Sequence, residues 1–328
     1  MSEPLYLGVD GGGTKTVAWV ATPTDGVVGV GRAGPANHQE SDVERAARAV
    51  QEAVEQALED AAAPAASVRR GVLALAGADF PEDVARLEEV LGPLLAPVPC
   101  HVVNDAEAAL VGGSHRGWGV VVIAGTGTNV LARDERGHTF HLGGLGYEFG
   151  DVGGGQDLVR AVLHAVFRSG EGRGPATALH DAVLSVLSVP DLEQLARGMY
   201  FGTIDREQFQ LLAPLAFQMA SRGDRVAQDL LVDMGMRLGE SAGAACSRLA
   251  NPGGVPVEVV LAGSLWHGPH PLLRDGFHVG LHRYTVSAED HLPALEPVAG
   301  AVLMAAEPEE ASRGAALRQC LEEVRSAE

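Results

Sequence analysis

Short apolar runs and longer helix-like repeats alternate along this chain. The short runs predict strands at residues 5–9, 17–21, 26–31, 71–76, 100–103, 119–124, 129–133, 138–142, 257–262 and 284–287. Apolar positions at helical spacing predict helices at residues 41–62, 81–95, 106–111, 152–167 and 314–325. Residues 176–249 are helix-patterned almost throughout, with breaks near Pro190, Gly202 and Gly223. This alternation predicts an α/β protein.

One pattern, a strand followed by a Gly/Thr turn and a returning strand, occurs twice. It appears around residues 5–21 and again around residues 119–133, with low residue identity between the two copies. We interpret it as a weak internal duplication. It predicts two α/β domains, residues 1–115 and 116–312, that flank a cleft. The last helix, within about residues 313–328, is expected to pack back on the first domain.

Composition narrows the class of protein. Of the 328 residues, 46% are apolar and 20% are charged, which is typical of a globular protein. The formal net charge of −19 argues against nucleic acid and anionic membranes as partners. No apolar run approaches the ~18 residues of a membrane span, and residues 1–6 lack the features of a signal peptide. The three cysteines form no CxxC metal or redox motif, and their odd, sparse count indicates a reducing compartment, so we expect a cytoplasmic protein.

The first glycine-rich turn follows the first predicted strand. Residues 8–16 read Gly-Val-Asp-Gly-Gly-Gly-Thr-Lys-Thr. Consecutive glycines permit positive φ and leave backbone N–H groups uncovered, so this turn is either an anion nest for phosphate or an ordinary glycine hairpin. It is not a Walker A loop, because Thr14 stands where that pattern needs lysine, and a strand follows in place of a helix.

Two further strand ends carry small residues. The turn Gly125-Thr126-Gly127-Thr128 ends the strand that opens the second unit, and Gly263-Ser264 end a later strand. Two Gly/Thr turns that face one cleft would grip a triphosphate from both sides; the alternative is a coincidence of β-turn composition. At Gly263-Ser264 a flat ring can lie against the backbone.

Two aspartates have both a chemical and a structural interpretation. Asp105 follows Asn104 between a strand and a helix, where a carboxylate can accept a hydroxyl proton and supply ~10²–10⁴-fold in rate. It can also be a helix N-cap worth ~1 kcal/mol, and the residue taken alone favours the cap. Asp151, in the glycine-rich loop 143–155, either holds substrate hydroxyls or caps the helix expected from Val152.

One histidine pair has a spacing that can serve a metal ion. His278 and His282 are four residues apart and would share a helix face. No third ligand stands nearby in the sequence, so we do not expect metal binding there.

Taken in this order, the motifs resemble the BadF/BadG/BcrA/BcrD ATPase family, and within it N-acetylglucosamine kinases, from Gly8 to about Trp266. The resemblance implies a duplicated actin/hexokinase-like (ribonuclease H-like) α/β fold that holds ATP between two domains, with Mg²⁺. It implies ATP-dependent phosphorylation of an amino sugar hydroxyl, with N-acetylglucosamine converted to its 6-phosphate. A homodimer is also what the resemblance implies.

The resemblance further assigns roles to single residues. Asp105 would be the catalytic base on the sugar hydroxyl, and Asp10 would orient Mg²⁺ through water. The ATP-binding residues would be Gly12, Gly13, Thr14, Lys15, Gly125, Thr126, Gly127, Thr128, Gly263 and Ser264. The sugar-binding residues would be Asn37, Asp79, Asn104, Asn129, Gly144 and Asp151.

Departures from the family pattern leave the sugar open. The family usually reads Gly-Asp-Glu-Gly-Ser where residues 150–154 read Gly-Asp-Val-Gly-Gly, Leu145 replaces a common Trp, and Ala76 lies where Ser is frequent. Lost polar contacts can change the substrate, so glucosamine, glucose and N-acetylmuramic acid are alternatives.

Two alternatives belong to other classes. One is an ATPase that activates dehydratases or reductases through an iron–sulfur cluster, but the cysteines lack a matching arrangement. The other is a non-catalytic sugar sensor, against which Asp10, Asp105 and both phosphate turns argue.

Overall fold

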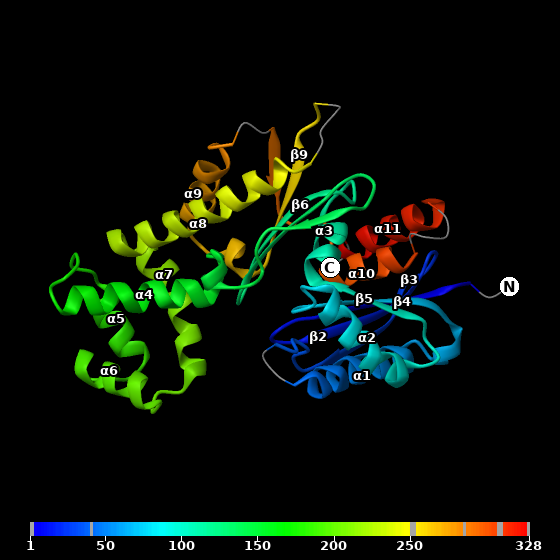
Figure 1. Ribbon diagram of the computed structural model, residues 1–328, viewed down its shortest axis with the longest axis horizontal. Coiled ribbons are helices and arrows are strands. Elements are labelled where there is room, and N and C mark those ends of the chain that lie inside the picture. Colours follow the sequence, from blue (N-terminus) through cyan, green and yellow to red (C-terminus); the bar gives the residue numbers. More distant parts are fainter. Residues whose placement is uncertain (1–2, 40–41, 250–253, 285–286, 307–310, 327–328) are drawn as a thin grey trace.

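The chain folds into two five-stranded sheets with helices packed on their faces (Figure 1). This computed structural model describes residues 3–39, 42–249, 254–284, 287–306 and 311–326. The first sheet contains β1 (Leu5–Gly11), β2 (Thr16–Thr22), β3 (Gly26–Ala33), β4 (Val68–Leu75) and β5 (Cys100–Asn104). The second contains β6 (Gly119–Ala124), β7 (Thr128–Arg133), β8 (Thr139–His141), β9 (Val257–Ala262) and β10 (Ala288–His291).

The two sheets have the same topology. Their strand orders are β3-β2-β1-β4-β5 and, read in the same sense, β8-β7-β6-β9-β10. In each sheet the first three strands are antiparallel neighbours, while the first, fourth and fifth run parallel. This equivalence confirms the internal duplication and the predicted α/β fold class.

Helices lie between the strands along the chain and after the last strand. The α-helices are α1 (Val43–Asp60), α2 (Pro81–Leu95), α3 (Asp105–Gly113), α4 (Gly155–Gly170), α5 (Leu179–Val186), α6 (Leu192–Phe201), α7 (Leu212–Ser221), α8 (Arg225–Cys246), α9 (Leu272–Leu281), α10 (Pro297–Ala306) and α11 (Ala311–Ser326). Short 3₁₀ helices lie at η1 (Ala65–Ser67), η2 (Tyr147–Phe149), η3 (Arg206–Leu211) and η4 (Ser264–His267). The breaks predicted near Pro190, Gly202 and Gly223 separate α5 to α8.

Helix boundaries follow from local chemistry. Asp42 caps α1, because its side chain accepts a hydrogen bond from the backbone N–H of Arg45, and Val and Ala residues along one face of the helix are buried. Gly202 ends α6 in a left-handed conformation that favours glycine.

One predicted helix was wrong in its start, and one strand was not predicted from the sequence. The helix expected from Val152 begins at Gly155, because residues 152–154 are extended or irregular and Gly154 is its N-cap. The short run expected at residues 284–287 is followed directly by β10, whose polar sequence Ala-Glu-Asp-His pairs with β9, a parallel neighbour that the local pattern cannot reveal. Residues 285–286 lie outside the described residues.

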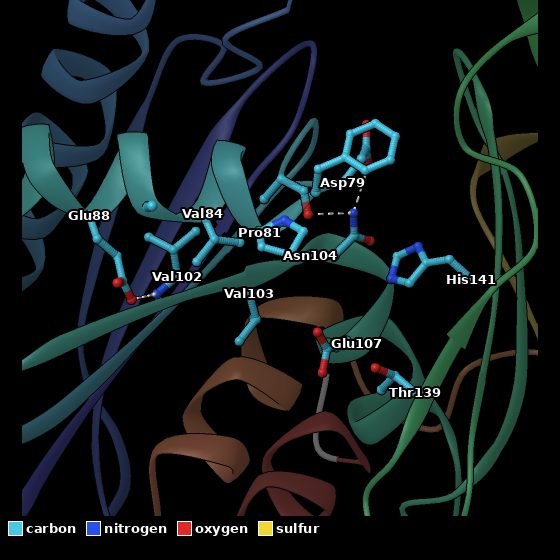
Figure 2. A pocket seen from close by; sticks show the side chains of 13 residues that line it. Asp79, Pro81, Val84, Glu88, Val102, Val103, Asn104, Glu107, Thr139 and His141 are labelled. Carbon is cyan, nitrogen blue, oxygen red and sulfur yellow. Dashed lines mark hydrogen bonds between the residues drawn. The ribbon is translucent and has the colours of Figure 1, made fainter.

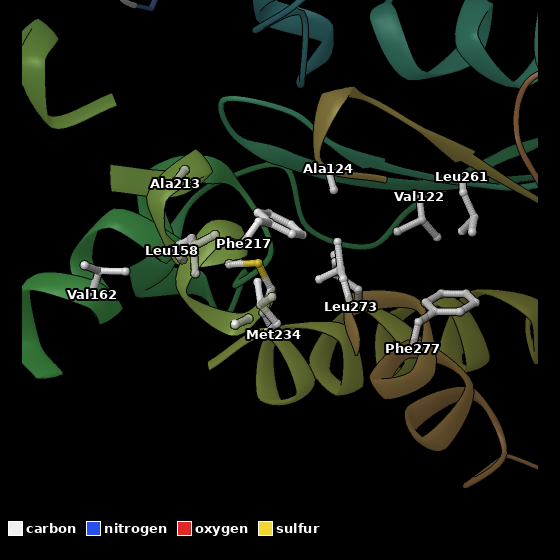
Figure 3. Close-up of a cluster of buried hydrophobic side chains, with 14 of the residues drawn as sticks. Val122, Ala124, Leu158, Val162, Ala213, Phe217, Met234, Leu261, Leu273 and Phe277 are labelled. Atoms are coloured by element: carbon white, nitrogen blue, oxygen red, sulfur yellow. The ribbon is translucent and has the colours of Figure 1, made fainter. Parts of the chain in front are cut away.

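The hydrophobic core of the second half lies on one face of its sheet. Val122 and Leu261 of the sheet face Leu273 and Phe277 of α9, and the cluster continues through α4, α7 and α8 (Figure 3). On the first sheet, α1 and α2 cover one face, while α10 and α11 pack against the other face beside Tyr6 and Ala21.

Helices α3 and α10 lie together between the two sheets (Figure 1). One face of α3 packs on β6, β7 and β9, and its other face contacts α10. The two helices approach at Gly112 and Gly300, where a Cβ on Gly300 would overlap the carbonyl oxygen of Ala108. This backbone contact therefore needs glycine and positions one sheet relative to the other.

The domain limits given above remain a prediction. Helix α10, which that division gives to the second domain, packs on β1 and β4 of the first sheet. We propose that α10 and α11 both belong to the first domain, so that the chain returns to it after β10.

No helix within the described ranges is both long enough and apolar enough to cross a membrane.

Gly300→Ala tests the contact between α3 and α10. We expect it to lower the midpoint of thermal unfolding, because a methyl group forced against backbone typically costs about 1–3 kcal/mol. The matched control is Gly92→Ala, a substitution in α2 where an added Cβ meets no atom within 4 Å. In thermal melts followed by circular dichroism, the unfolding midpoint of the control should equal or exceed that of the wild type. Equal decreases in both variants would contradict this packing account.

Candidate active site

The carboxyl ends of three parallel strands meet at one edge of the first sheet. The register pairs Gly11 of β1 with Leu75 of β4, and Leu75 with Asn104 of β5. The backbone N–H of Ala76 donates to the carbonyl of Gly11 at 2.8 Å, which joins the loops after β1 and β4. Asp10, the loop that holds Asp79, and Asp105 are therefore gathered at this edge.

Asn104 is the buried centre of a hydrogen-bond network. Its side-chain amide donates to Asp79 Oδ1 at 2.9 Å and to the carbonyl of Ala78 at 3.3 Å. Its oxygen accepts from the backbone N–H of Ala106 at 3.0 Å, so Asn104 is the N-cap of α3. The cap predicted for Asp105 therefore belongs to its neighbour, and the Asp105 side chain extends from the first turn of the helix.

Asn129 of β7 connects the second sheet to this network. Its side-chain amide donates to Asn104 Oδ1 at 3.0 Å and to Asp105 Oδ1 at 3.4 Å. Its own oxygen is buried and has no hydrogen-bond partner among the described residues. Since a buried acceptor normally has a donor, this oxygen is suited to receive a ligand hydroxyl.

The environment of Asp105 raises the pKa of its carboxyl group towards neutral pH, as a general base requires. Burial is the main cause that raises its pKa to about 6, and the neighbouring carboxylate of Asp79 acts in the same direction. Hydrogen bonds from Asn129 and from backbone N–H groups oppose the rise. A carboxyl group with this pKa is ionised at neutral pH and still has proton affinity.

Asp10 lies at the end of β1 among other acids. Burial raises its pKa to about 7, and the negative charges of Asp105 and Glu296 add to the effect, whereas Lys15 lowers it. Crowded carboxylates are the donor set that a hard divalent cation prefers, so these residues fit Mg²⁺.

The first glycine turn is a hairpin that leaves its tip accessible. Gly12 donates its N–H to the carbonyl of Lys15 at 3.0 Å, and Thr14 and Lys15 are exposed. Glycine would permit a positive φ at this turn, but neither Gly12 nor Gly13 adopts one.

The second Gly/Thr turn is held by the N-terminus of α4. Gly155 N–H donates to the carbonyl of Gly125 at 2.8 Å, and Gln156 N–H donates to that of Thr126 at 3.1 Å. In a trans peptide unit the C=O and the next N–H point in opposite directions. The N–H groups of Thr126 and Gly127 therefore point away from α4, as an anion cradle requires.

Three more residues predicted to contact the nucleotide, Thr128, Gly263 and Ser264, lie at or beside this turn. The Thr128 hydroxyl donates to the carbonyl of Ile123 at 3.0 Å. Gly263, with φ of 98°, passes so close to Ala124 and Gly125 that a side chain would collide with their backbone, and Ser264 next to it is exposed.

The glycine-rich loop encloses Asp151, which does not cap α4. Its Oδ2 accepts hydrogen bonds from the backbone N–H groups of Leu145 and Gly146 at 2.8 and 2.9 Å. Gly144, with φ of 88°, lies against Asn129, where an added Cβ would be 2.8 Å from the amide oxygen. The loop thus brings Gly144 to the network, while Asp151 shapes the loop itself.

Asn37 reaches the network through a residue that the sequence did not indicate. Its Oδ1 accepts from the backbone N–H of Gln39 at 3.0 Å, and the Gln39 side chain donates to Asp79 Oδ2 at 2.8 Å. A polar residue in a loop carries no distinctive pattern, so only the fold reveals this bridge.

A cavity of about 440 Å³ opens beside Asp79 and Asn104 (Figure 2). The sequence did not indicate several polar residues in its wall, namely Glu88, Glu107, Thr139 and His141. Burial raises the pKa of Glu107, an effect that Arg133 opposes, and burial lowers the pKa of His141, an effect that Asp79 opposes. The wall therefore contains the acidic residues Asp79, Glu88 and Glu107, of which Glu107 has a raised proton affinity, and a histidine that favours its neutral form.

Comparison with known proteins identifies relatives across most of the chain. The model of the BadF/BadG/BcrA/BcrD ATPase family matches residues 7–305. An N-acetylmuramic acid/N-acetylglucosamine kinase of Clostridium acetobutylicum is 30% identical over 232 residues, 71% of this chain and 76% of that protein. An N-acetyl-D-glucosamine kinase of Dictyostelium discoideum is 30% identical over 248 residues, with the same shares covered. A crystal structure from Chromobacterium violaceum, provisionally named an N-acetylglucosamine kinase, superposes with a TM-score of 0.70 and 26% identity over 93% of this chain and 99% of that chain.

Asp105→Asn should stabilise the folded protein above pH 6. The pKa of Asp105 is about 6 in the fold against 3.8 for the free group, so the folded state binds more protons between these values and loses stability as the pH rises. Asparagine removes this penalty, and we expect the unfolding midpoint at pH 8 to rise by roughly 1–4 °C in nucleotide-free, magnesium-free buffer.

The control for this prediction is Asp134→Asn. A hydrogen bond with His138 lowers the pKa of Asp134, so this variant should not gain stability at pH 8. The gain of Asp105→Asn should vanish near pH 4; a gain that is independent of pH would show that ionisation of Asp105 is not its cause.

Proposed function

Since the chain belongs to the BadF/BadG/BcrA/BcrD ATPase family, we propose that it is an ATP-dependent sugar kinase that converts N-acetylglucosamine to its 6-phosphate. The observation that carries the proposal is the position of Asp105. This carboxylate is hydrogen-bonded to Asn129 at the junction of the two sheets, in the same network as Asp79 of the cavity. The activities named for the two relatives of 30% identity support it.

In the proposed reaction Asp105 is the general base. It accepts the proton of the sugar 6-hydroxyl while that oxygen forms a bond to the γ-phosphorus of ATP. The bond between the γ-phosphorus and the β–γ bridging oxygen breaks, and ADP leaves with the electron pair. With a pKa of about 6, Asp105 is ready to take the proton at neutral pH.

The two glycine turns would hold the triphosphate. Gly12, Gly13, Thr14 and Lys15 would contribute N–H groups, a hydroxyl and a positive charge from one side. Gly125, Thr126, Gly127 and Thr128 would contribute the cradle braced by α4 from the other. Gly263 and Ser264 would lie along the adenosine, because Gly263 packs closely on the second glycine turn at Gly125 and Ser264 beside it is exposed.

Asp10 would hold Mg²⁺ through water. The ion would neutralise charge on the transferring phosphoryl group. The residues fit this role because burial and the nearby charges of Asp105 and Glu296 raise the pKa of Asp10, an unfavourable charge environment that a cation would relieve.

The sugar would bind at the Asn104 network. The unpartnered oxygen of Asn129 would accept a hydroxyl hydrogen, which would satisfy a buried acceptor. Asn37, Asp79, Asn104, Gly144 and Asp151 would line or shape the same site, and Gln39 would hold Asn37 and Asp79 in position.

The charge of the cavity wall bears on the choice among sugars. Asp79, Glu88 and Glu107 would repel the lactyl carboxylate of N-acetylmuramic acid, whereas neutral N-acetylglucosamine and cationic glucosamine meet no such penalty. We therefore propose N-acetylglucosamine first and glucosamine as the alternative.

The cysteines argue against an iron–sulfur activator. Cys100 packs against the core of the first sheet, and Cys246 lies inside the core of the second. Burial raises the pKa of both thiols to about 12, so neither is a ready thiolate ligand. We propose a cytoplasmic location, where ATP is available and free thiols persist, and a homodimer that sedimentation would test.

Asp105→Asn should lower kcat by at least ~10²-fold, since general-base catalysis typically supplies ~10²–10⁴-fold. A coupled ADP-release assay with ATP, Mg²⁺ and N-acetylglucosamine measures it. The wild-type kcat/KM should fall below about pH 6, where the base becomes protonated. Near-normal turnover in the variant would remove Asp105 from this role, and binding without turnover by the wild type would favour a sugar sensor.

Removing the charge of Glu107 should change the relative kcat/KM for the four candidate sugars. In a panel of N-acetylglucosamine, glucosamine, glucose and N-acetylmuramic acid, we expect N-acetylmuramic acid to be disfavoured. Glu107→Gln should raise its kcat/KM severalfold relative to N-acetylglucosamine, because one repelling charge is removed. Glu89→Gln, on the exposed face of α2 outside the cavity, is the control. An unchanged ratio in Glu107→Gln would contradict the electrostatic account.

A further inference from the structure

Three metal-ligating side chains from distant parts of the sequence converge beside the segments that connect the two sheets. His115 follows α3, Glu258 lies near the start of β9, and His291 ends β10. Each offers one ligand atom, and these atoms lie within 4.8 Å of one another. The group is separate from the Asn104 network, because Glu258 is near the amino end of β9 and Gly263 follows its carboxyl end.

His291 presents a nitrogen lone pair that nothing uses. Its Nδ1 lies 2.9 Å from the carbonyl oxygen of Leu292, which can only accept, so Nδ1 carries the proton. Nε2 therefore has the lone pair, and it is buried without a hydrogen-bond partner in the part of the chain that the structure describes. A metal-binding histidine is typically oriented in this way, with its other nitrogen donating to a carbonyl.

Glu258 is buried and directs one oxygen to the histidines. Its Oε2 accepts hydrogen bonds from the Ser114 hydroxyl and from the backbone N–H of His115. Its Oε1 lies 3.5 Å from His115 Nδ1 and 3.7 Å from Arg116 Nε. The carboxylate is thus fixed by one oxygen, while the other faces the site.

We propose that His115, Glu258 and His291 bind a divalent transition-metal ion of the zinc type. Two imidazoles and a carboxylate are a ligand set that Zn²⁺ takes, with a water as the fourth ligand. The set must contract for bonds of about 2.0–2.2 Å, and the exposed ring of His115 is free to rotate inward.

The position of the site suggests what the ion does. The N–H groups of Ala294 and Leu295 donate to the carbonyls of Gly113 and Gly112 at 3.0 and 3.1 Å, so the end of α3 and the segment after β10 lie side by side here. One ion would join both connecting segments to β9. Since it binds only the folded arrangement, it would stabilise this junction.

The positive charge of Arg116 would weaken binding of the proposed ion. Its guanidinium faces the same Glu258 oxygen and donates to the carbonyl of Pro256 at 2.9 Å. Removing this charge should strengthen metal binding, an effect in the opposite direction to that of removing a ligand.

Titration of the chelator-treated protein with Zn²⁺ at pH 7.5, in competition with a chromophoric chelator, tests the site. We expect one bound ion, at least tenfold weaker binding in His115→Ala and His291→Gln, and tighter binding in Arg116→Ala. Co²⁺ should give the visible bands of a four-coordinate site in the wild type, and Zn²⁺ should raise its unfolding midpoint.

The control is His282→Ala, because His282, at the C-terminal cap of α9, belongs to the His278 and His282 pair with helical spacing and is not part of the proposed site. It should bind Zn²⁺ as the wild type does. His115 is exposed, so His115→Ala is expected to fold even if His291→Gln does not. Absence of stoichiometric binding in the wild type, unchanged binding in His115→Ala, or loss of binding in His282→Ala would overturn the proposal.

Discussion

The arrangement of this molecule depends on one buried side chain, Asn104. Its amide and carbonyl together bond the loop after β4, the first turn of α3 and Asn129 of the second sheet. A buried amide that loses a partner leaves a costly unsatisfied group, so the three partners hold each other in place. Asp105 follows Asn104 directly, and its position at the junction of the sheets is a consequence of this network.

The same region contains charges that oppose folding. Burial raises the pKa of both Asp10 and Asp105, and a neighbouring carboxylate adds to it in each case, Asp105 beside Asp10 and Asp79 beside Asp105, so ionisation of these groups destabilises the apo protein near neutral pH. The surrounding structure offsets this cost through tight packing, as at Gly300 between α3 and α10. Retained strain of this kind is expected where carboxylates must act on a ligand.

Much of the fold could be predicted from local pattern. Strands such as β6 and β9 are short apolar runs, and each is ended by glycine, so both their type and their limits are visible in the sequence. The start of α4 was not, because Asp151 has the composition of a cap but is bound by Leu145 and Gly146 N–H groups. β10 is polar and forms through pairing with β9, which no local pattern encodes.

Some residues of the site could likewise be predicted from the sequence, and others could not. Asn104 and Asp105 directly follow a predicted strand, and a strand end that is visible in the sequence marks the edge of the sheet where the site lies. Gln39, Glu107 and His141 carry no such signal, because they come together with the site only when separate segments of the chain meet. The cluster of His115, Glu258 and His291 is the extreme case, since its members are far apart in the chain and have no recognisable spacing.

The most direct test of the proposed chemistry is to identify the product. A reaction of ATP and N-acetylglucosamine, followed by ³¹P–¹H correlated NMR, reports where the γ-phosphoryl group goes. The account predicts a new phosphomonoester signal coupled to the protons on carbon 6, with one ADP formed per sugar. Inorganic phosphate as the only product, or phosphorus coupled to another position of the sugar, would contradict it.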